Sequence, residues 1–321
     1  MCTALGFRAN HNLFGRTLDI DRTYGEEVVI LPRGKKLTFR LEEAPQHFAM
    51  IGTAHVVQEQ PLYYDAMNEC GLCAAALNFP NFCRYIKTAA AGRKSVYSFE
   101  VIPWALRQCK DLLQARMLLE QTQILAGDFS ENFPATPLHW MFFDSTGSFI
   151  METTRDGMQF YDTPMDVMTN SPTYDWHLQN LSNHAYLSNQ NRIGVLQDFP
   201  ACSLGTGAMG LPGDYSSPSR FVKAAFLLKC SKKGETVHGN VAQFFRMMAA
   251  ISPVRGSVKT AEGKDHYTVY ASCMDASAGV YYYTTYENNR ICAVDLRKEN
   301  LDGRDLIRYP MMHQADVFYQ N

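Results

Sequence analysis

Strand-like and helix-like segments follow one another in blocks along this chain, and that order restricts its fold more than any other feature. Five strand-like stretches come first, two helical stretches follow, and further strands, helices and strands complete the chain. Regular strand–helix alternation, which produces parallel sheets, is missing, so the order favours antiparallel sheets with helices packed outside them, an α+β fold. We find no internal repeat and no low-complexity linker, and we expect residues 1–321 to form a single domain.

The expected elements are delimited by turn residues and by changes in the hydrophobic period. The expected strands are 1–8, 12–19, 27–31, 48–57, 72–78, 138–143, 149–153, 158–161, 166–170, 266–273, 279–286 and 290–295, and the expected helices are 98–106, 110–125, 174–181, 217–228 and 241–251. Residues 129–137 and the polar, then glycine-rich stretch 182–215 are expected to be loops. A loop as long as the second one usually serves function or an interface.

Composition limits the function classes. Hydrophobic residues make up 46% of the chain and charged residues 19%, which is enough for a large core. The net charge of −2 argues against a nucleic-acid partner, because no strongly basic field is available to bind phosphates. No apolar run approaches the roughly 20 residues of a membrane span, and no signal-peptide pattern is visible, so we expect a cytoplasmic protein without a membrane partner.

The N-terminus holds the clearest candidate for chemistry. Cys2 follows the initiator methionine directly, and a small second residue normally allows removal of Met1, so we expect the mature chain to begin at Cys2. One residue then carries both a thiol and a free α-amine. The amine, with an ordinary pKa of about 7.7–8.0, can act as a base toward its own side chain.

The spacing of the next residues supports this interpretation. Residues 2–8 alternate like a strand, 10–12 form a turn signal, and the chain then returns, so a hairpin brings Arg16 and Asp19 close to Cys2. An arginine beside a thiol favours the thiolate, and a carboxylate can orient the amine. The alternative at this point is an ordinary buried cysteine on an N-terminal edge strand.

The other cysteines suggest little chemistry. The chain has 9 cysteines, an odd number, so a disulfide framework is not expected. Cys70 and Cys73 have the spacing of a redox motif or half a zinc site, but no second pair follows. We expect a turn leading into a strand there, and no metal or cofactor.

Nine short segments, in order, resemble one known family. They are MCT at 1–3, GRTLD at 15–19, MNE at 67–69, LNFP at 77–80, LHW at 138–140, TNSPT at 169–173, LPGD at 211–214, SRF at 219–221 and YYYTTYENN at 281–289. Together they resemble the choloylglycine hydrolase family, which contains bile salt hydrolases and penicillin V acylases and belongs to the N-terminal-nucleophile (Ntn) hydrolases. The resemblance runs nearly end to end and is weakest in the last fifteen residues.

The resemblance implies more than the residue pattern can. It implies a four-layer αββα sandwich of two antiparallel sheets, exposure of Cys2 by removal of Met1, cleavage of a non-peptide amide, and a homotetramer. It also implies that the 182–215 loop is an extended assembly segment that reaches a neighbouring subunit.

Roles at the site follow from the same resemblance. It implies that Cys2 attacks the amide carbonyl through Sγ, that Arg16 favours its thiolate, and that Asp19 hydrogen-bonds its α-amine. It further implies that the side chain of Asn170 and the backbone N–H of Asn78 form the oxyanion hole.

A sixth polar residue completes the implied site. Arg220 would support the charge balance around Cys2. Taken singly, some of these residues have simpler explanations: Asn78 and Asn170 precede Phe-Pro and Ser-Pro as good turn residues, and Arg220 suits the first exposed turn of a helix.

The substrate is the most open question. An apolar acyl group needs a wide apolar pocket, and the candidate lining residues are Leu18, Phe129, Phe133 and Leu138, which could equally be core residues. Bile salt hydrolases of the family tend to carry Asn at the position of Asn78, where penicillin V acylases tend to carry Tyr. The resemblance therefore favours a conjugated bile salt hydrolase that releases glycine or taurine. A penicillin V acylase, an acyl-homoserine lactone hydrolase and a catalytically idle binding protein are the alternatives.

Overall fold

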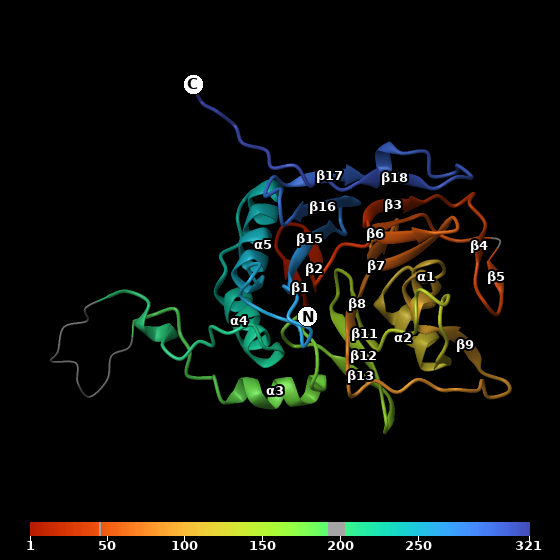
Figure 1. Ribbon diagram of the computed structural model, residues 1–321, viewed down its shortest axis with the longest axis horizontal. Helices are drawn as coiled ribbons and strands as arrows, with labels where there is room; N and C mark the ends of the chain where they lie inside the picture. Colours follow the sequence, from red (N-terminus) through yellow and green to blue (C-terminus); the bar gives the residue numbers. More distant parts are fainter. Residues whose placement is uncertain (45, 192–202) are drawn as a thin grey trace.

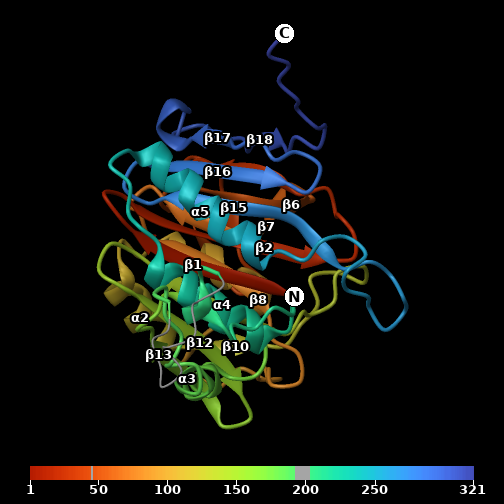
Figure 2. The ribbon, with the colours of Figure 1, turned by 90° about the vertical axis from the view of Figure 1, so that its left-hand side faces the viewer.

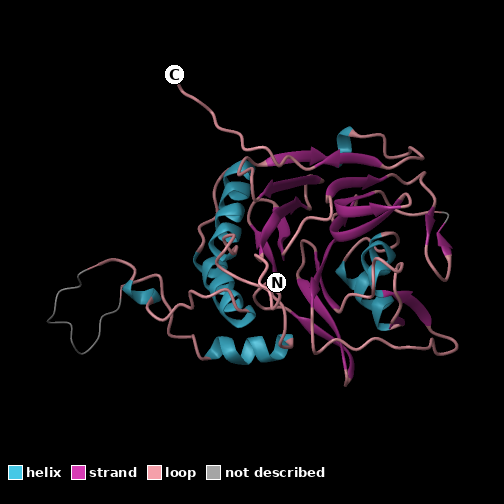
Figure 3. Ribbon diagram, viewed as in Figure 1, coloured by secondary structure: helices cyan, strands magenta, loops and turns pink. Residues whose placement is uncertain are grey.

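Two large antiparallel sheets lie face to face, with helices on both outer sides (Figures 1 and 3). The structure is a computed structural model, and it describes residues 1–44, 46–191 and 203–321. Each sheet is covered by helices on one face and by the other sheet on the opposite face, so its strands are buried on both sides. This is the αββα arrangement expected from the sequence, and the expected fold class is confirmed.

The first sheet contains the N-terminus. Its strand order is β14-β1-β2-β15-β16-β17, and every neighbouring pair is antiparallel. The strands are β1 (Cys2–Arg8), β2 (Asn12–Ile20), β14 (Val167–Met168), β15 (Tyr267–Asp275), β16 (Val280–Thr285) and β17 (Cys292–Asp295). The first and the last third of the chain therefore meet in one sheet.

The second sheet has the order β13-β12-β11-β8-β7-β6-β3-β18 and is also antiparallel. Its strands are β3 (Glu27–Leu31), β6 (Met50–Val57), β7 (Gln60–Asn68), β8 (Cys73–Asn78), β11 (Leu138–Phe143), β12 (Ser148–Thr154), β13 (Gly157–Asp162) and β18 (Ile307–Pro310). Two small sheets accompany it, one of β4 (Leu37–Thr38) and β5 (Glu43–Ala44), the other of β9 (Lys94–Tyr97) and β10 (Thr122–Leu125).

The helices form the two outer layers. Figure 2 shows α4 (Ser217–Cys230) and α5 (Val237–Ile251) in front of the first sheet, and α3 (Tyr174–Ser182) lies beside them. On the other side, α1 (Val101–Leu106) and α2 (Leu112–Glu120) pack against the second sheet. Three 3₁₀ turns, at Ser98–Glu100, Thr206–Ala208 and Leu296–Lys298, complete the described elements.

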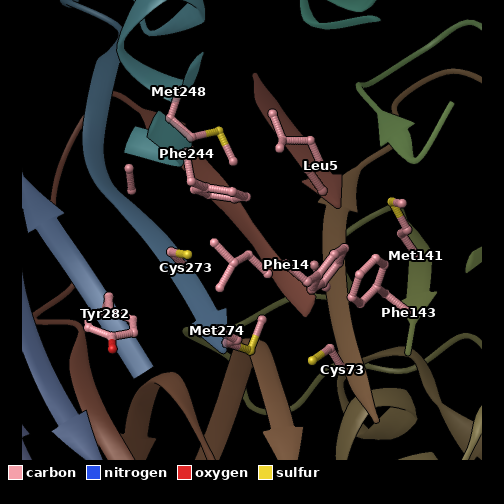
Figure 4. Packing of buried hydrophobic residues seen from close by; sticks show 14 of the residues in the cluster. Leu5, Phe14, Cys73, Met141, Phe143, Phe244, Met248, Cys273, Met274 and Tyr282 are labelled. Atoms are coloured by element: carbon pink, nitrogen blue, oxygen red, sulfur yellow. The ribbon is translucent and has the colours of Figure 1, made fainter. Parts of the chain in front are cut away.

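The main hydrophobic core joins the sheets to each other and to α5. Phe14 of β2 stacks on Phe143 of β11, with ring centroids 5.2 Å apart, and so links the two sheets (Figure 4). Phe244 and Met248 of α5 belong to the same buried cluster. Successive side chains of a strand point to opposite faces of its sheet. The first sheet therefore packs against the second sheet on one face and against α5 on the other.

One expected helix is shorter than the sequence suggested. The apolar stripe within 110–125 predicts a single helix, but α2 ends at Glu120 and Thr122–Leu125 form β10, which pairs in parallel with β9. All four residues of β10 are buried. Helical and strand periodicities cannot be distinguished over four apolar residues, and the pairing with a distant strand decides the outcome.

Two strands of the second sheet were not predicted. β7 precedes the turn expected at 67–71, and β18 lies in the C-terminal stretch that reads as a polar tail. Their places in the sheet are set by their partners, which are β6 and β8 for the first strand and β3 for the second. Within the expected 182–215 loop, residues 192–202 lie outside the described residues.

Candidate active site

The N-terminal hairpin brings three of the expected site residues together. In the ladder of β1 and β2, Cys2 pairs with Leu18 and Ala4 pairs with Arg16. The Cys2 side chain is buried, and the Arg16 Nη2 group donates to its Sγ at 2.7 Å. A guanidinium at this distance stabilises negative charge on the sulfur.

The remaining Arg16 donors are held by backbone carbonyls. Its Nη1 group donates to the carbonyls of Ala76 at 2.6 Å and Tyr64 at 3.3 Å, and its Nε donates to the carbonyl of Thr17 at 3.1 Å. Burial alone would lower the pKa of Arg16, but the sulfur of Cys2 and nearby acidic groups outweigh it and raise the pKa above its ordinary value. Arg16 is therefore a fixed positive charge with one donor aimed at the sulfur.

Asp19 lies in the same ladder and is fully buried. Its carboxylate accepts from the hydroxyl of Thr268 at 2.6 Å and from the hydroxyl of Thr17 at 3.1 Å. The Thr17 hydroxyl in turn accepts from the backbone N–H of Thr3 at 3.1 Å. These contacts fix the carboxylate close to the start of β1.

Met1 extends the ladder by one residue and occupies the space in front of Asp19. The backbone N–H of Asp19 donates to the Met1 carbonyl at 3.0 Å, and the Met1 ammonium donates to the Asp19 carbonyl at 2.8 Å. The His266 Nε2 atom also lies 2.8 Å from the Met1 nitrogen. Burial lowers the pKa of the Met1 ammonium, and the neighbouring sulfur and carboxylate only partly oppose it.

Asn170 connects the two sheets and α4. Its Oδ1 accepts from the backbone N–H of Cys2 and from Arg220 Nη2, each at 2.7 Å. Its Nδ2 donates to the carbonyl of Asn78 at 2.7 Å, and its second N–H has no partner among the described residues. Its own backbone is held by Ser217 and His177.

Arg220 reaches the N-terminal residue from the first turn of α4. Its Nη1 group donates to the Cys2 carbonyl and to the Thr3 hydroxyl, and its Nε donates to the Tyr215 carbonyl at 2.9 Å. Only 1% of Arg220 is exposed, so the surface position that helical pattern alone would suggest is wrong. Burial lowers its pKa, although Asp19 and Cys2 oppose the effect.

A second buried network supports Asn170 from behind. His177 donates through Nε2 to the Asn170 carbonyl at 2.8 Å, and burial lowers the pKa of its imidazole to about 4. The His139 ring, 2.8 Å from the Thr169 carbonyl and 3.2 Å from Glu152, lies next to it. These histidines and the glutamate were not predicted as site residues, since nothing local in the sequence marks them.

A cavity of about 390 Å³ opens beside Cys2. All four expected pocket residues line it, namely Leu18, Phe129, Phe133 and Leu138, as do Arg16, Asp19 and Asn78. Asn170 and Arg220 are not among the lining residues, and they contact the backbone of Cys2. The cavity also has lining residues that the sequence analysis missed, among them Tyr24, His55, Leu62, Tyr64 and His266.

Of the five residues just named, His55 lies on β6, Leu62 and Tyr64 lie on β7, and His266 immediately precedes β15. The alternation of Leu62 and Tyr64 was a signal of β7 that could have been used. His266 had no such signal, because its position depends on the ladder that joins β2 to β15. Asn78 contributes its carbonyl to Asn170, while its own side-chain Oδ1 is buried without a partner among the described residues.

The described residues contain no cluster of three or more histidine, cysteine or acidic side chains that could hold a metal ion. Likewise, no helix in the described ranges is long and apolar enough to cross a membrane.

Comparison with known proteins gives a consistent result over the whole chain. The family model of linear amide C–N hydrolases, choloylglycine hydrolase family, matches residues 2–309. A bile salt hydrolase/transferase of Lactiplantibacillus plantarum is 41% identical, and one of Clostridium perfringens is 36% identical, each with 100% of both chains covered.

Solved structures agree with the sequence comparison. A cysteine-to-alanine variant of the conjugated bile acid hydrolase from Clostridium perfringens superposes with a TM-score of 0.94 at 33% identity, with both chains fully covered. A penicillin V acylase from Agrobacterium tumefaciens reaches a TM-score of 0.76 at 20% identity, covering 98% of this chain and 94% of its own. The latter similarity shows a common fold.

Proposed function

This chain belongs to the choloylglycine hydrolase family of linear amide C–N hydrolases and is an amidohydrolase, and we propose that its substrates are bile acids joined by an amide to glycine or taurine. The observation that carries the proposal is the position of the Cys2 sulfur, which lies in the wall of a largely apolar cavity and beside the Arg16 guanidinium. Full-length similarity to proteins named bile salt hydrolases supports the choice of substrate.

The cavity suits a rigid apolar acyl group. Its volume of about 390 Å³ falls within the usual range for small-molecule sites, roughly 300–1,000 Å³. Leu18, Phe129, Phe133 and Leu138 supply apolar lining without ionic demands. Met1 lines the same space, so its removal would enlarge the cavity next to the nucleophile.

The proposed reaction has two halves. In the first, the α-amine of Cys2 takes the thiol proton, the sulfur attacks the amide carbonyl, and the intermediate collapses to a thioester as the amine returns a proton to departing glycine or taurine. In the second, the same amine takes a proton from water, the hydroxide attacks the thioester, and the bile acid leaves as the sulfur is regenerated. No other reactant is needed.

Neighbouring residues take the supporting roles. Arg16 stabilises the thiolate, and the free N–H of Asn170, together with the backbone N–H of Asn78, would receive the developing oxyanion, a contribution of about 2.7–4 kcal/mol for a donor of this kind. The Asp19 carboxylate, which the hydroxyls of Thr17 and Thr268 hold, would take the α-amine as its partner once Met1 has left. Arg220 fixes the carbonyl of Cys2 and so orients the nucleophile.

The mechanism requires that the mature chain begin at Cys2. While Met1 is attached, the Cys2 nitrogen is an amide that donates to Asn170 and cannot act as a base. We therefore infer that Met1 is removed so that Cys2 carries the free α-amine, and we propose separately that the chain folds as a single domain. Intact-mass measurement of the active protein should show loss of one methionine, and full activity in a chain that retains Met1 would contradict the mechanism.

A substrate panel tests the proposal directly. Purified protein with a confirmed N-terminus is incubated with glycocholate, taurocholate and penicillin V between about pH 4 and pH 8, and the released amine or acid is quantified. We expect release of glycine or taurine at a higher kcat/KM than turnover of penicillin V. Faster turnover of penicillin V, or no amine release at any pH, would overturn the assignment.

Substitutions of Cys2 test its role as the nucleophile. Cys2→Ala should abolish turnover while keeping the melting temperature within a few degrees, because a small side chain is lost, and Cys2→Ser should also lose most activity, since a serine hydroxyl is a poorer nucleophile with this base. Activity retained in Cys2→Ala would exclude the proposed mechanism.

Acyl transfer is a second candidate activity. Relatives from Lactiplantibacillus plantarum and Clostridium perfringens are named hydrolase/transferase, and a thioester can be attacked by an amine as well as by water. With glycocholate and excess taurine, transfer would form taurocholate and regenerate the thiol. Mass spectrometry of the product mixture would detect it, and hydrolysis products alone would exclude it under those conditions.

We also propose a cytoplasmic homotetramer. The 8 described cysteines are all unpaired, which is typical of a reducing compartment. Exposed apolar side chains near the 182–215 segment, Trp176 and Leu204, support its role in assembly. Native mass spectrometry should give four times the 36.3 kDa chain mass, and cell fractionation tests the compartment.

A further inference from the structure

One wall of the cavity beside Cys2 carries polar groups that no neighbour uses. It is formed by the β6–β7 hairpin, where His55 lies opposite Leu62 in the antiparallel ladder. Paired residues share a face of a sheet, which places His55 and Leu62 together, and the nearby Tyr64 opens onto the same space. All three line the cavity. This wall therefore presents an imidazole and a phenol close to one leucine.

The imidazole of His55 is held in place by aromatic rings. It lies 5.2 Å from the ring of Phe133 and 6.4 Å from the ring of Tyr24, centroid to centroid. Its Nδ1 is buried, and neither ring nitrogen has a hydrogen-bond partner among the described residues. A buried N–H without an acceptor costs about 1–3 kcal/mol, so the proton of the neutral ring belongs on Nε2, where a ligand can accept it.

The position of the Tyr64 side chain depends on an irregularity in the pairing of β6 with β7. The register of β6 and β7 shifts between Thr53 and Ala54, which leaves Tyr64 as the extra residue of a β-bulge. Bulges of this kind redirect a side chain next to an active site. The Tyr64 carbonyl accepts from Arg16, while its hydroxyl has no partner among the described residues. Burial raises the pKa of the phenol above its ordinary value, so the hydroxyl stays neutral.

Much of the remaining lining is apolar. Leu18, Ile20, Phe129 and Leu138 can contact only the hydrocarbon part of a ligand, while Ser98, Asn132 and Thr136 add a few polar groups elsewhere. A ligand that satisfies both kinds of wall must be apolar over most of its surface and carry hydrogen-bonding groups along one side. A flexible fatty acyl chain meets the first requirement and fails the second.

We propose that His55 and Tyr64 bind hydroxyl groups on the acyl part of the substrate, and so select a rigid acyl group with hydroxyls along one face. This inference rests on the proposed function and specifies which part of the bile acid the cavity recognises. Each hydrogen bond would be formed with the bound acyl group and lost with an analogue that has no hydroxyl there. The half-buried imidazole and phenol are then covered by the ligand without gaining a partner, which is why such sites discriminate against the poorer ligand.

The test uses glycine conjugates that differ only in hydroxylation. The panel comprises trihydroxy, dihydroxy and monohydroxy 5β-cholanic acids and the hydroxyl-free 5β-cholanic acid, each joined to glycine. The measured quantity is the ratio of kcat/KM for each hydroxylated conjugate to that for the hydroxyl-free one. For the wild-type protein, we expect at least one ratio of about 3–10, the range given by one neutral hydrogen bond.

Substitutions at His55 and Tyr64 test whether these two residues cause the preference for hydroxylated conjugates. His55→Phe keeps a ring for the contacts with Phe133 and Tyr24 but has no donor, and Tyr64→Phe removes only the hydroxyl and leaves the carbonyl that binds Arg16. Each should lower the largest ratio at least threefold. His55→Gln, which places an N–H near the position of Nε2, should recover part of it. The matched control is His238→Phe, an exposed histidine on α5 outside the cavity, which should leave every ratio unchanged.

The outcomes separate the two levels of the proposal. Equal release from all conjugates by the wild type, or ratios that stay the same in His55→Phe and Tyr64→Phe, would overturn the inference and leave the bile salt assignment intact. No glycine release from any conjugate, with penicillin V hydrolysed, would overturn the assignment itself and the inference with it. Ratios that fall in both variants and recover in His55→Gln would support both.

Discussion

At the scale of single residues, the site depends on one positive charge that cannot move. Arg16 uses separate donors for the Cys2 sulfur and for three backbone carbonyls, so the guanidinium is fixed from three directions. Lysine carries the same charge on one nitrogen and cannot reproduce this planar set of bonds. Charge alone is therefore not enough at this position.

We predict that Arg16→Lys lowers kcat/KM on the order of 100-fold, the cost of misplacing a catalytic group by about 1 Å. The rate at which iodoacetamide alkylates Cys2 should fall in parallel, because alkylation reports the thiolate. Arg155→Lys, at a highly exposed position, is the control and should change neither rate. Normal alkylation in Arg16→Lys would show that the arginine does not act on the sulfur.

A second prediction at this scale concerns acid stability. Burial lowers the pKa of His177 from 6.5 to about 4, so the unfolded chain binds a proton at higher pH than the folded protein does. The contribution of this histidine is complete above about pH 6.5 and is lost as the pH falls toward 4, for a total on the order of 3 kcal/mol.

His177→Gln removes this titration and can still donate to the Asn170 carbonyl. The urea midpoint of the variant should therefore fall less steeply than that of the wild type between pH 6.5 and pH 4.5. Identical pH slopes for the two proteins would contradict the prediction, whatever their stabilities at pH 7.

At the scale of elements, the N-terminal hairpin is positioned by close contact between β2 and β15. Gly15 lies so near β15 that a Cβ atom added there would be 2.0 Å from the carbonyl oxygen of Ser272. The obstacle is backbone, which cannot rotate away as a side chain can. Since β2 also carries Arg16 and Asp19, the spacing of these two strands bears directly on the site.

We predict that Gly15→Ala destabilises the protein by about 1–3 kcal/mol, as overpacking usually does, and lowers kcat/KM as well. Gly213→Ala is the matched control, because no atom lies within 4 Å of its added Cβ. Chemical denaturation measures both variants, and equal stability of the two would show that β2 and β15 separate without cost.

At the scale of the whole molecule, assembly remains a proposal that one variant can test. Leu204 is 90% exposed in the described part of the 182–215 segment, although leucine is a typical core residue. If this segment reaches a neighbouring subunit, Leu204→Asp should shift the native mass below that of a tetramer. Leu113→Asp, at an exposed leucine on α2, should leave the mass unchanged. A tetramer in both variants would contradict the proposed role.

The residue pattern alone was enough to predict those features that depend on residues close together in the chain. The block order of strands and helices indicated antiparallel sheets, and the N-terminal hairpin placed Arg16 and Asp19 beside Cys2, because a hairpin's register follows from a few consecutive residues. The αββα layering, the residues proposed for the oxyanion hole and Arg220 came from a resemblance carried by short motifs and did not come from periodicity.

The tertiary structure was needed to find those features that depend on residues far apart in the chain. β7 and β10 are strands because of what they pair with, Arg220 is buried because α4 packs on β1, and His266 meets Met1 only through the β2–β15 ladder. His55 and Tyr64 form one polar wall through a cross-strand pairing and a bulge that leave no mark in the sequence. Contacts between residues far apart in the chain are decided by the packing of the whole molecule, and a linear pattern does not contain them.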